Sequence, residues 1–87
     1  MTRTRDDILD LLFRAVREVE GDSVAHLSRA DFAAAGPHDL NMDSLNLLEV
    51  EMMASTDLGE EVEFPDLVPG IRFGELADGI LLKLKQV

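Results

Sequence analysis

The chain has 87 residues and no cysteine, with 18 acidic and 8 basic side chains and a formal net charge of −10 at pH 7. This length fits one domain over residues 1–87, with residues 1–4 expected to be disordered. Without cysteine there is no disulfide framework and no thiolate metal site, which suits the cytoplasm. The charge disfavours nucleic acid and anionic membranes as partners, and no apolar run approaches the ~20 residues of a membrane span. We expect a monomer whose partners are proteins with basic patches.

The first predicted helix covers residues 5–20. It begins after a capping-box pattern, Thr4-x-x-Asp7, and apolar residues such as Ile8, Leu12 and Val16 recur at helical spacing until Gly21. These signals predict an amphipathic helix with one buried face.

A long connection follows over residues 21–43, and a connection of this length should be functional or hold structure of its own. The pattern Ser28-x-x-Asp31 predicts a short helical turn. Three apolar residues are expected to pin the connection to the core: Leu27, Phe32 and Leu40.

The next predicted helix runs from Ser44 to Leu58, with Asp43 as its N-cap. One apolar stripe faces inward, and a second stripe is left without an intramolecular partner. The inward stripe comprises Leu47, Val50, Met53/Ala54 and Leu58, and the second comprises Leu45, Leu48 and Met52. Glu51 lies beside the inward stripe, and we interpret it as an edge position with its carboxylate in solvent.

After Gly59, the alternation over residues 60–65 is too short to predict a strand, and residues 66–70 allow at most one helical turn. The last predicted helix covers residues 72–86. The predicted fold is therefore all-α, a small antiparallel bundle of three main helices plus a short fourth.

The segment Asp39-Leu-Asn-Met-Asp-Ser-Leu45 contains the most informative residues of the chain. Ser44 opens a helix, where free amide groups and the helix dipole favour a phosphate. Neither histidine stands in a triad arrangement with it, so no base is evident that would make it a catalytic nucleophile. One alternative is a plain helix cap. A second is a calcium loop, but Ser44 and Val50 occupy the positions that need glycine and glutamate.

Residues 39–45 resemble the Asp-Leu-Gly-x-Asp-Ser-Leu signature of the acyl carrier protein family. The resemblance extends over the whole chain, because Phe64-Pro65-Asp66 is similar to the family's Ile-Pro-Asp and the helices fall in the same order. It implies a carrier that is not itself an enzyme and binds no metal. A phosphopantetheinyl transferase would attach 4'-phosphopantetheine, taken from coenzyme A, to Ser44, beside Asp43 and Leu45.

The resemblance also implies that acyltransferase or ligase and synthase enzymes with basic patches dock around this serine. The residues expected to form that surface are Asp43, Leu45, Leu48, Glu49 and Met52. Asn41 stands where the family has glycine, and Asn46, Ser55 and Thr56 stand where fatty-acid carriers usually have acids. These departures favour a stand-alone carrier of a polyketide-type pathway. The alternatives are an aminoacyl or peptidyl carrier, an ordinary fatty-acid carrier, or a helical interaction module that has lost the arm.

Overall fold

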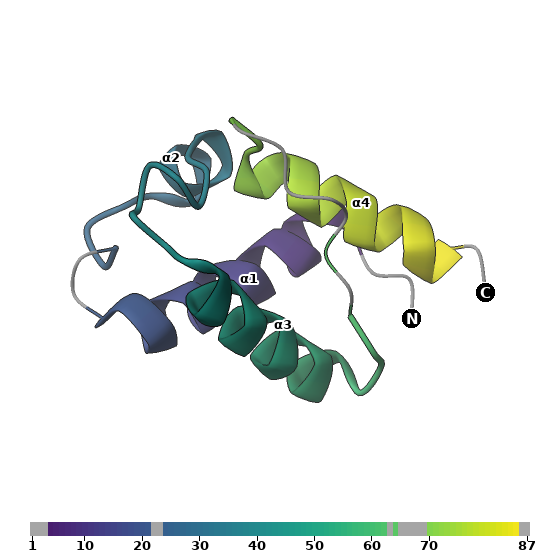
Figure 1. The fold of residues 1–87 in the computed structure, drawn as a ribbon. Helices are drawn as coiled ribbons and strands as arrows, with labels where there is room; N and C mark the ends of the chain where they lie inside the picture. Colours follow the sequence, from purple (N-terminus) through teal and green to yellow (C-terminus); the bar gives the residue numbers. More distant parts are fainter. Residues whose placement is uncertain (1–3, 22–23, 63, 65–69, 86–87) are drawn as a thin grey trace.

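The computed structural model describes residues 4–21, 24–62, 64 and 70–85, which contain four helices. These are α1 (Arg5–Glu20), α2 (Arg29–Ala34), α3 (Ser44–Leu58) and α4 (Phe73–Lys85) (Figure 1). No strand occurs in this part of the chain, which confirms the all-helical prediction. Two segments for which the sequence makes predictions, residues 1–3 and residues 65–69, lie outside the described residues.

Side-chain caps explain where the first three helices begin. Thr4 accepts a hydrogen bond from the Asp7 N–H and donates its own N–H to the Asp7 carboxylate, which completes the predicted capping box. Thr4, within the segment expected to be disordered, thus lies at the N-cap of α1 in the structure. Ser28 caps α2 by accepting from the Asp31 N–H, which confirms the short helix predicted there. Asp43 caps α3 as predicted.

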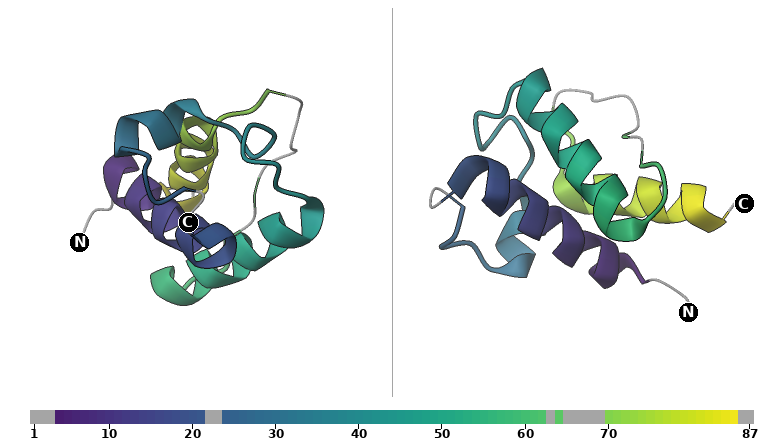
Figure 2. Two further views of the ribbon diagram at one scale, coloured as in Figure 1. Left: turned by 90° about the vertical axis from the view of Figure 1, so that its left-hand side faces the viewer. Right: turned by 90° about the horizontal axis from the view of Figure 1, so that it is seen from below.

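The helices pack around α1. It packs closely against each of the other three, and α2 also packs against α4, whereas the backbones of α3 and α4 do not approach each other closely over their described residues. In both Figure 1 and Figure 2, α1 runs in the opposite general direction to α3 and α4. The radius of gyration, 11.9 Å, matches the ~12 Å of a compact domain of this length, so the chain forms a small helical bundle.

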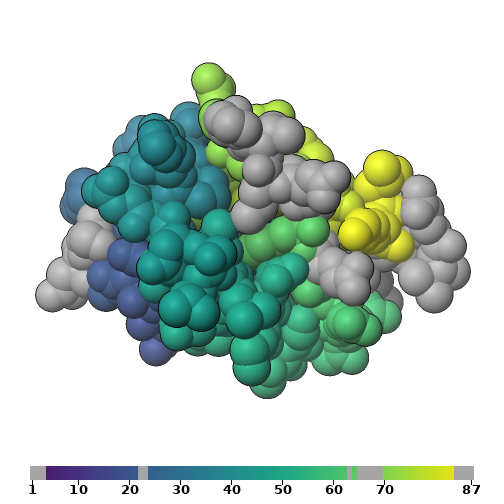
Figure 3. All heavy atoms as spheres, viewed as in Figure 1, coloured from purple at the N-terminus to yellow at the C-terminus, as the bar shows by residue number. Residues whose placement is uncertain are grey.

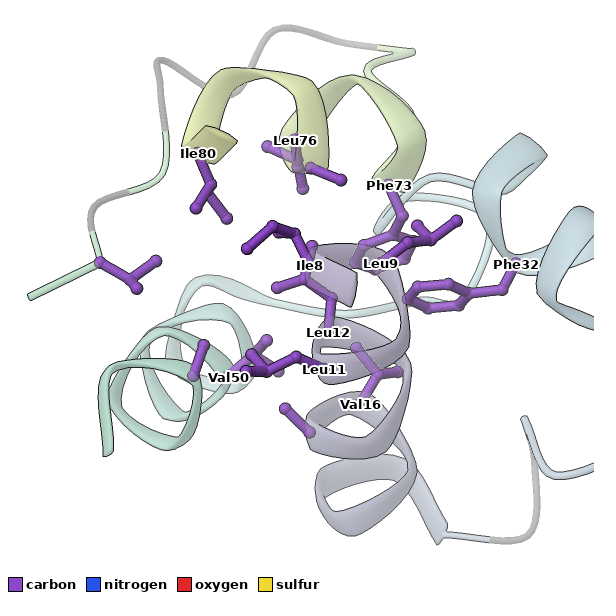
Figure 4. Packing of buried hydrophobic residues seen from close by; sticks show 14 of the residues in the cluster. Ile8, Leu9, Leu11, Leu12, Val16, Phe32, Val50, Phe73, Leu76 and Ile80 are labelled. Atoms are coloured by element: carbon purple, nitrogen blue, oxygen red, sulfur yellow. The ribbon is translucent and has the colours of Figure 1, made fainter. Parts of the chain in front are cut away.

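The core combines one face of each helix, as Figure 4 shows. The predicted inward faces of α1 and α3 are buried, and α4 contributes Phe73, Leu76, Ala77 and Ile80. Phe32 is fully buried between Phe13 and Phe73, with ring centroids 4.7 and 4.3 Å away and nearly parallel planes. Leu27 and Leu40 pack against this core, so all three predicted anchors of the long connection are confirmed.

An ion pair fastens α2 to α1 from the outside. The Arg29 guanidinium donates two hydrogen bonds to the two carboxylate oxygens of Asp10, at 2.6 and 2.9 Å. Bonding to this carboxylate raises the pKa of Arg29 above its ordinary value. Both side chains are about half exposed, so the ion pair contributes little to the free energy of folding and mainly orients α2 on α1. None of the described helices has the length and apolar character that crossing a membrane requires.

Candidate functional site at the start of α3

The start of α3 is closed by a reciprocal capping box. The Asp43 carboxylate accepts from the Asn46 N–H at 2.9 Å, and the Asn46 side-chain oxygen accepts from the Asp43 N–H at 3.1 Å. A helix leaves its first amide groups without intrahelical partners. The box satisfies two of them, whereas the N–H groups of Ser44 and Leu45 have no acceptor among the described residues. Two backbone donors therefore remain open beside the Ser44 side chain.

Ser44 is exposed, and its hydroxyl makes no hydrogen bond to any residue that the structure describes. The other described serines have structural roles. Ser28 caps α2, and the Ser55 hydroxyl bonds to two backbone groups at 2.8 Å. Ser44 is thus the one serine of the described chain whose hydroxyl is free to be modified without breaking an internal contact.

The loop before Ser44 is tightly folded. The Pro37 carbonyl accepts hydrogen bonds from the N–H groups of Leu40 and Met42. Met42 is buried in the core, which fixes the chain one residue before the Asp43 cap. Gly36 packs closely against Ile71, which precedes α4. A Cβ at position 36 would collide with the Ile71 carbonyl. Ser44 is therefore presented from a braced loop.

Asn41 has a φ of 56°, in the left-handed region. Glycine adopts this conformation most readily, and asparagine is among the few other residues that visit it routinely. Asn41, which stands where the signature that residues 39–45 resemble has glycine, therefore adopts a backbone geometry that glycine would also take.

The second apolar stripe of α3 is exposed, as predicted. Leu45, Leu48 and Met52 expose 68%, 51% and 62% of their surface, and Glu49 between them is also exposed. Large apolar side chains gathered on one face are typical of protein contact sites. α3 forms part of the face shown in Figure 3, where its atoms run from teal into green. The structure thus brings the predicted partner residues together beside Ser44.

Glu51 differs from its prediction. The residue is half-buried, and its carboxylate accepts a hydrogen bond from the Phe64 N–H at 2.7 Å. One turn later, Ser55 accepts from the Val62 N–H. Sequence reasoning missed this pair, although two polar residues four apart beside an inward stripe were the available signal.

The calcium alternative finds no support in the geometry. Asp39 accepts from the Gly36 N–H, and the Asp43 carboxylate is used in the capping box. Among the described residues, no three histidine or acidic side chains are grouped so that they could hold a metal ion. His26 and His38 are exposed in turns.

Comparison of the chain with protein-family models, curated proteins and solved structures gives no match. Function is therefore inferred from the residues and geometry of the chain itself.

Proposed function

We propose that the protein is an acyl carrier, on which a 4'-phosphopantetheine arm is attached to the Ser44 hydroxyl. The observation that carries this proposal is the free, exposed hydroxyl of Ser44, since the other described serines are engaged in backbone hydrogen bonds. The arm's terminal thiol would hold an acyl group as a thioester while partner enzymes act on it.

The residues around Ser44 fit a phosphodiester at this position. The N–H groups of Ser44 and Leu45 are open donors, and the positive end of the α3 dipole favours an anion. Asp43 keeps the helix start in place through the capping box. No base among the described residues forms a hydrogen bond with the Ser44 hydroxyl, so a separate phosphopantetheinyl transferase would activate it. That step joins the serine oxygen to the phosphorus of the arm, and the nucleotide part of coenzyme A leaves.

Partner enzymes would dock on the exposed stripe of α3. Leu45, Leu48 and Met52 provide an apolar centre, and the carboxylates of Asp43 and Glu49 provide a charged rim. A net charge of −10 would steer enzymes with basic patches toward this face.

The test is intact-mass analysis after incubation with coenzyme A and a phosphopantetheinyl transferase of broad specificity. We expect one arm on the wild-type protein and on Ser55→Ala, and none on Ser44→Ala. The far-ultraviolet circular dichroism of Ser44→Ala should match the wild type, because the exposed Ser44 side chain makes no hydrogen bond to any described residue. An arm still attached to Ser44→Ala, or no arm on the wild type, would contradict the proposal.

A further inference from the structure

Three methionines lie in the described part of the chain, and their burial differs. Met42 is 9% exposed and belongs to the core, and Met53 is half-buried and packs against the core. Met52 exposes 62% of its surface. The chain has no cysteine, so methionine thioethers hold its only sulfur atoms. Among the described residues, Met52 is therefore the sulfur-containing side chain that a solute reaches most easily.

The position of Met52 on α3 explains this exposure. Successive residues of a helix are turned by about 100° around its axis, so neighbouring side chains face different surroundings. Met53 packs inward beside Ala54, whereas Met52 lies one turn after Leu48 on the exposed stripe. The Met52 side chain does not belong to the core cluster, so a change in its chemistry leaves the packing of the bundle intact.

An exposed thioether reacts with hydroperoxides. With hydrogen peroxide, the sulfur lone pair attacks one oxygen, an S–O bond forms as the O–O bond breaks, and the other oxygen leaves as water with both protons. The sulfur loses two electrons and becomes a sulfoxide, which a thiol-dependent reductase returns to the thioether with formation of a disulfide and water. Hydrogen peroxide is uncharged, so the net charge of −10 does not repel it from the surface.

A sulfoxide at position 52 would place a polar oxygen in the apolar centre of the stripe. It would lie on the same face of α3 as Leu45 and Leu48. The side chains one turn away offer it no donor, because Leu48 is apolar and the Thr56 hydroxyl already donates to the Met52 carbonyl. An enzyme that covers this face would remove water from the oxygen, and a buried polar atom without a hydrogen-bond partner opposes binding.

We propose that Met52 is a site of reversible oxidation, at which a hydroperoxide converts the thioether to the sulfoxide and weakens enzyme docking on the exposed stripe of α3. The site follows from the exposure of this side chain, and its effect on docking rests on the function proposed above. The protein then acquires its arm slowly after exposure to peroxide and recovers when the sulfoxide is reduced.

Peptide mass mapping tests the site. The native protein is treated with hydrogen peroxide, and catalase then removes the excess. We expect an added oxygen to appear several-fold faster at Met52 than at Met53 or Met42, and at similar rates at all three in urea. Met52→Leu should lose the fast reaction, and Met53→Leu, the matched control at the next residue, should retain it. Equal rates at Met52 and Met53 in the native protein would overturn the assignment.

The effect on docking is measured as the transferase kcat/KM for loading Ser44 from coenzyme A. Each protein is compared with its own untreated form, so a change in basal activity caused by a substitution does not enter the ratio. Oxidation should lower kcat/KM about five- to thirtyfold in the wild type and in Met53→Leu, and reductase treatment should restore it. In Met52→Leu, peroxide should leave kcat/KM unchanged.

An undiminished kcat/KM in the oxidised wild-type protein would overturn the effect on docking. So would an equal loss in Met52→Leu, because the loss would then come from another residue. Far-ultraviolet circular dichroism should show that the oxidised protein keeps its helices, and a loss of helical signal would assign the effect to unfolding and overturn it as well. Failure of the untreated protein to accept an arm would instead refute the proposed function, and the peptide mapping would still decide the oxidation site.

Discussion

The stacking of three phenylalanine rings allows a quantitative prediction of how strongly the long connection before Ser44 is held to the core. Phe32 of α2 is fully buried, with Phe13 of α1 on one side and Phe73 of α4 on the other. A stacked aromatic pair adds ~0.5–1.5 kcal/mol beyond the burial of its area. Phe32→Leu loses two such pairs and changes the shape of a core side chain, which itself costs up to ~1.5 kcal/mol. We expect it to lower the free energy of unfolding by about 2–4 kcal/mol.

Phe13→Leu is the matched comparison. Phe13 is half-buried and stacks only on Phe32, with the Arg17 guanidinium 5.8 Å from its ring centre. Losing one pair should cost about 1–2 kcal/mol. The difference between the two variants is measurable, because a domain of this length has a total stability of about 4–13 kcal/mol.

Urea denaturation followed by far-ultraviolet circular dichroism is the suitable assay, because the chain has no tryptophan or tyrosine to report by fluorescence. A double variant, Phe13→Leu/Phe32→Leu, closes a mutant cycle, and the coupling energy between the two rings should be ~0.5–1.5 kcal/mol. A coupling below ~0.3 kcal/mol would refute the reasoning, as would a Phe32→Leu cost no larger than that of Phe13→Leu. In either case the stacked geometry would not contribute to stability.

Two further predictions concern the surface. Leu48→Ala and Met52→Ala should each lower the transferase kcat/KM by up to ~30-fold, corresponding to ~2 kcal/mol, and Glu49→Lys should mainly slow association. The control is Leu82→Ala, which truncates an exposed leucine on α4 and should leave turnover unchanged; equal losses in Leu82→Ala would reject α3 as the docking face. The second prediction is that moderate salt raises the melting temperature, because a net charge of −10 on a small fold is self-repelling and salt screens it. A melting temperature that stays flat from low to moderate salt would contradict this.

Local signals in the sequence were sufficient to predict the helices. Thr4, Ser28 and Asp43 each cap the helix that the pattern predicted, and α3 has the predicted bounds. Gly59 ends α3 in the left-handed conformation that favours glycine. Caps act over three or four residues, so the residues that determine them are visible in a short window of sequence.

Contacts between distant residues could not be predicted in the same way. Glu51 bonds to a backbone group thirteen residues later, and the path of the chain after Gly59 decides that contact. The exposure of Ser44 followed from its place at a helix start. That its hydroxyl is free could not be predicted from the residue type, because the hydroxyls of Ser28 and Ser55 both form hydrogen bonds. Which serine is available depends on the tertiary fold.

The charge pattern along α3 bears on the pathway, which we propose is polyketide-type. Asn46, Ser55 and Thr56 stand where the fatty-acid carriers that the chain resembles usually have acids. An enzyme matched to those acids would therefore lose complementary charge and associate more slowly. The three positions differ in the contacts that their side chains make. Ser55 joins α3 to the chain after Gly59, because its hydroxyl accepts a hydrogen bond from the Val62 N–H, and a glutamate there would remove that hydroxyl.

Asn46 and Thr56 can accept an acid without such a loss. Aspartate at position 46 retains an oxygen acceptor for the Asp43 N–H, and Thr56 is exposed and bonds only to the Met52 carbonyl one turn before it. The informative variant is therefore Asn46→Asp/Thr56→Glu, with Ser55 left in place. If the proposed function holds, we expect a malonyl transferase of fatty-acid synthesis to load the wild-type protein more slowly than a standard fatty-acid carrier, and the variant to recover part of the difference at low salt. Wild-type loading as fast as the standard carrier, with no gain in the variant, would show that the missing acids do not decide the pathway. An ordinary fatty-acid carrier would then be the better interpretation.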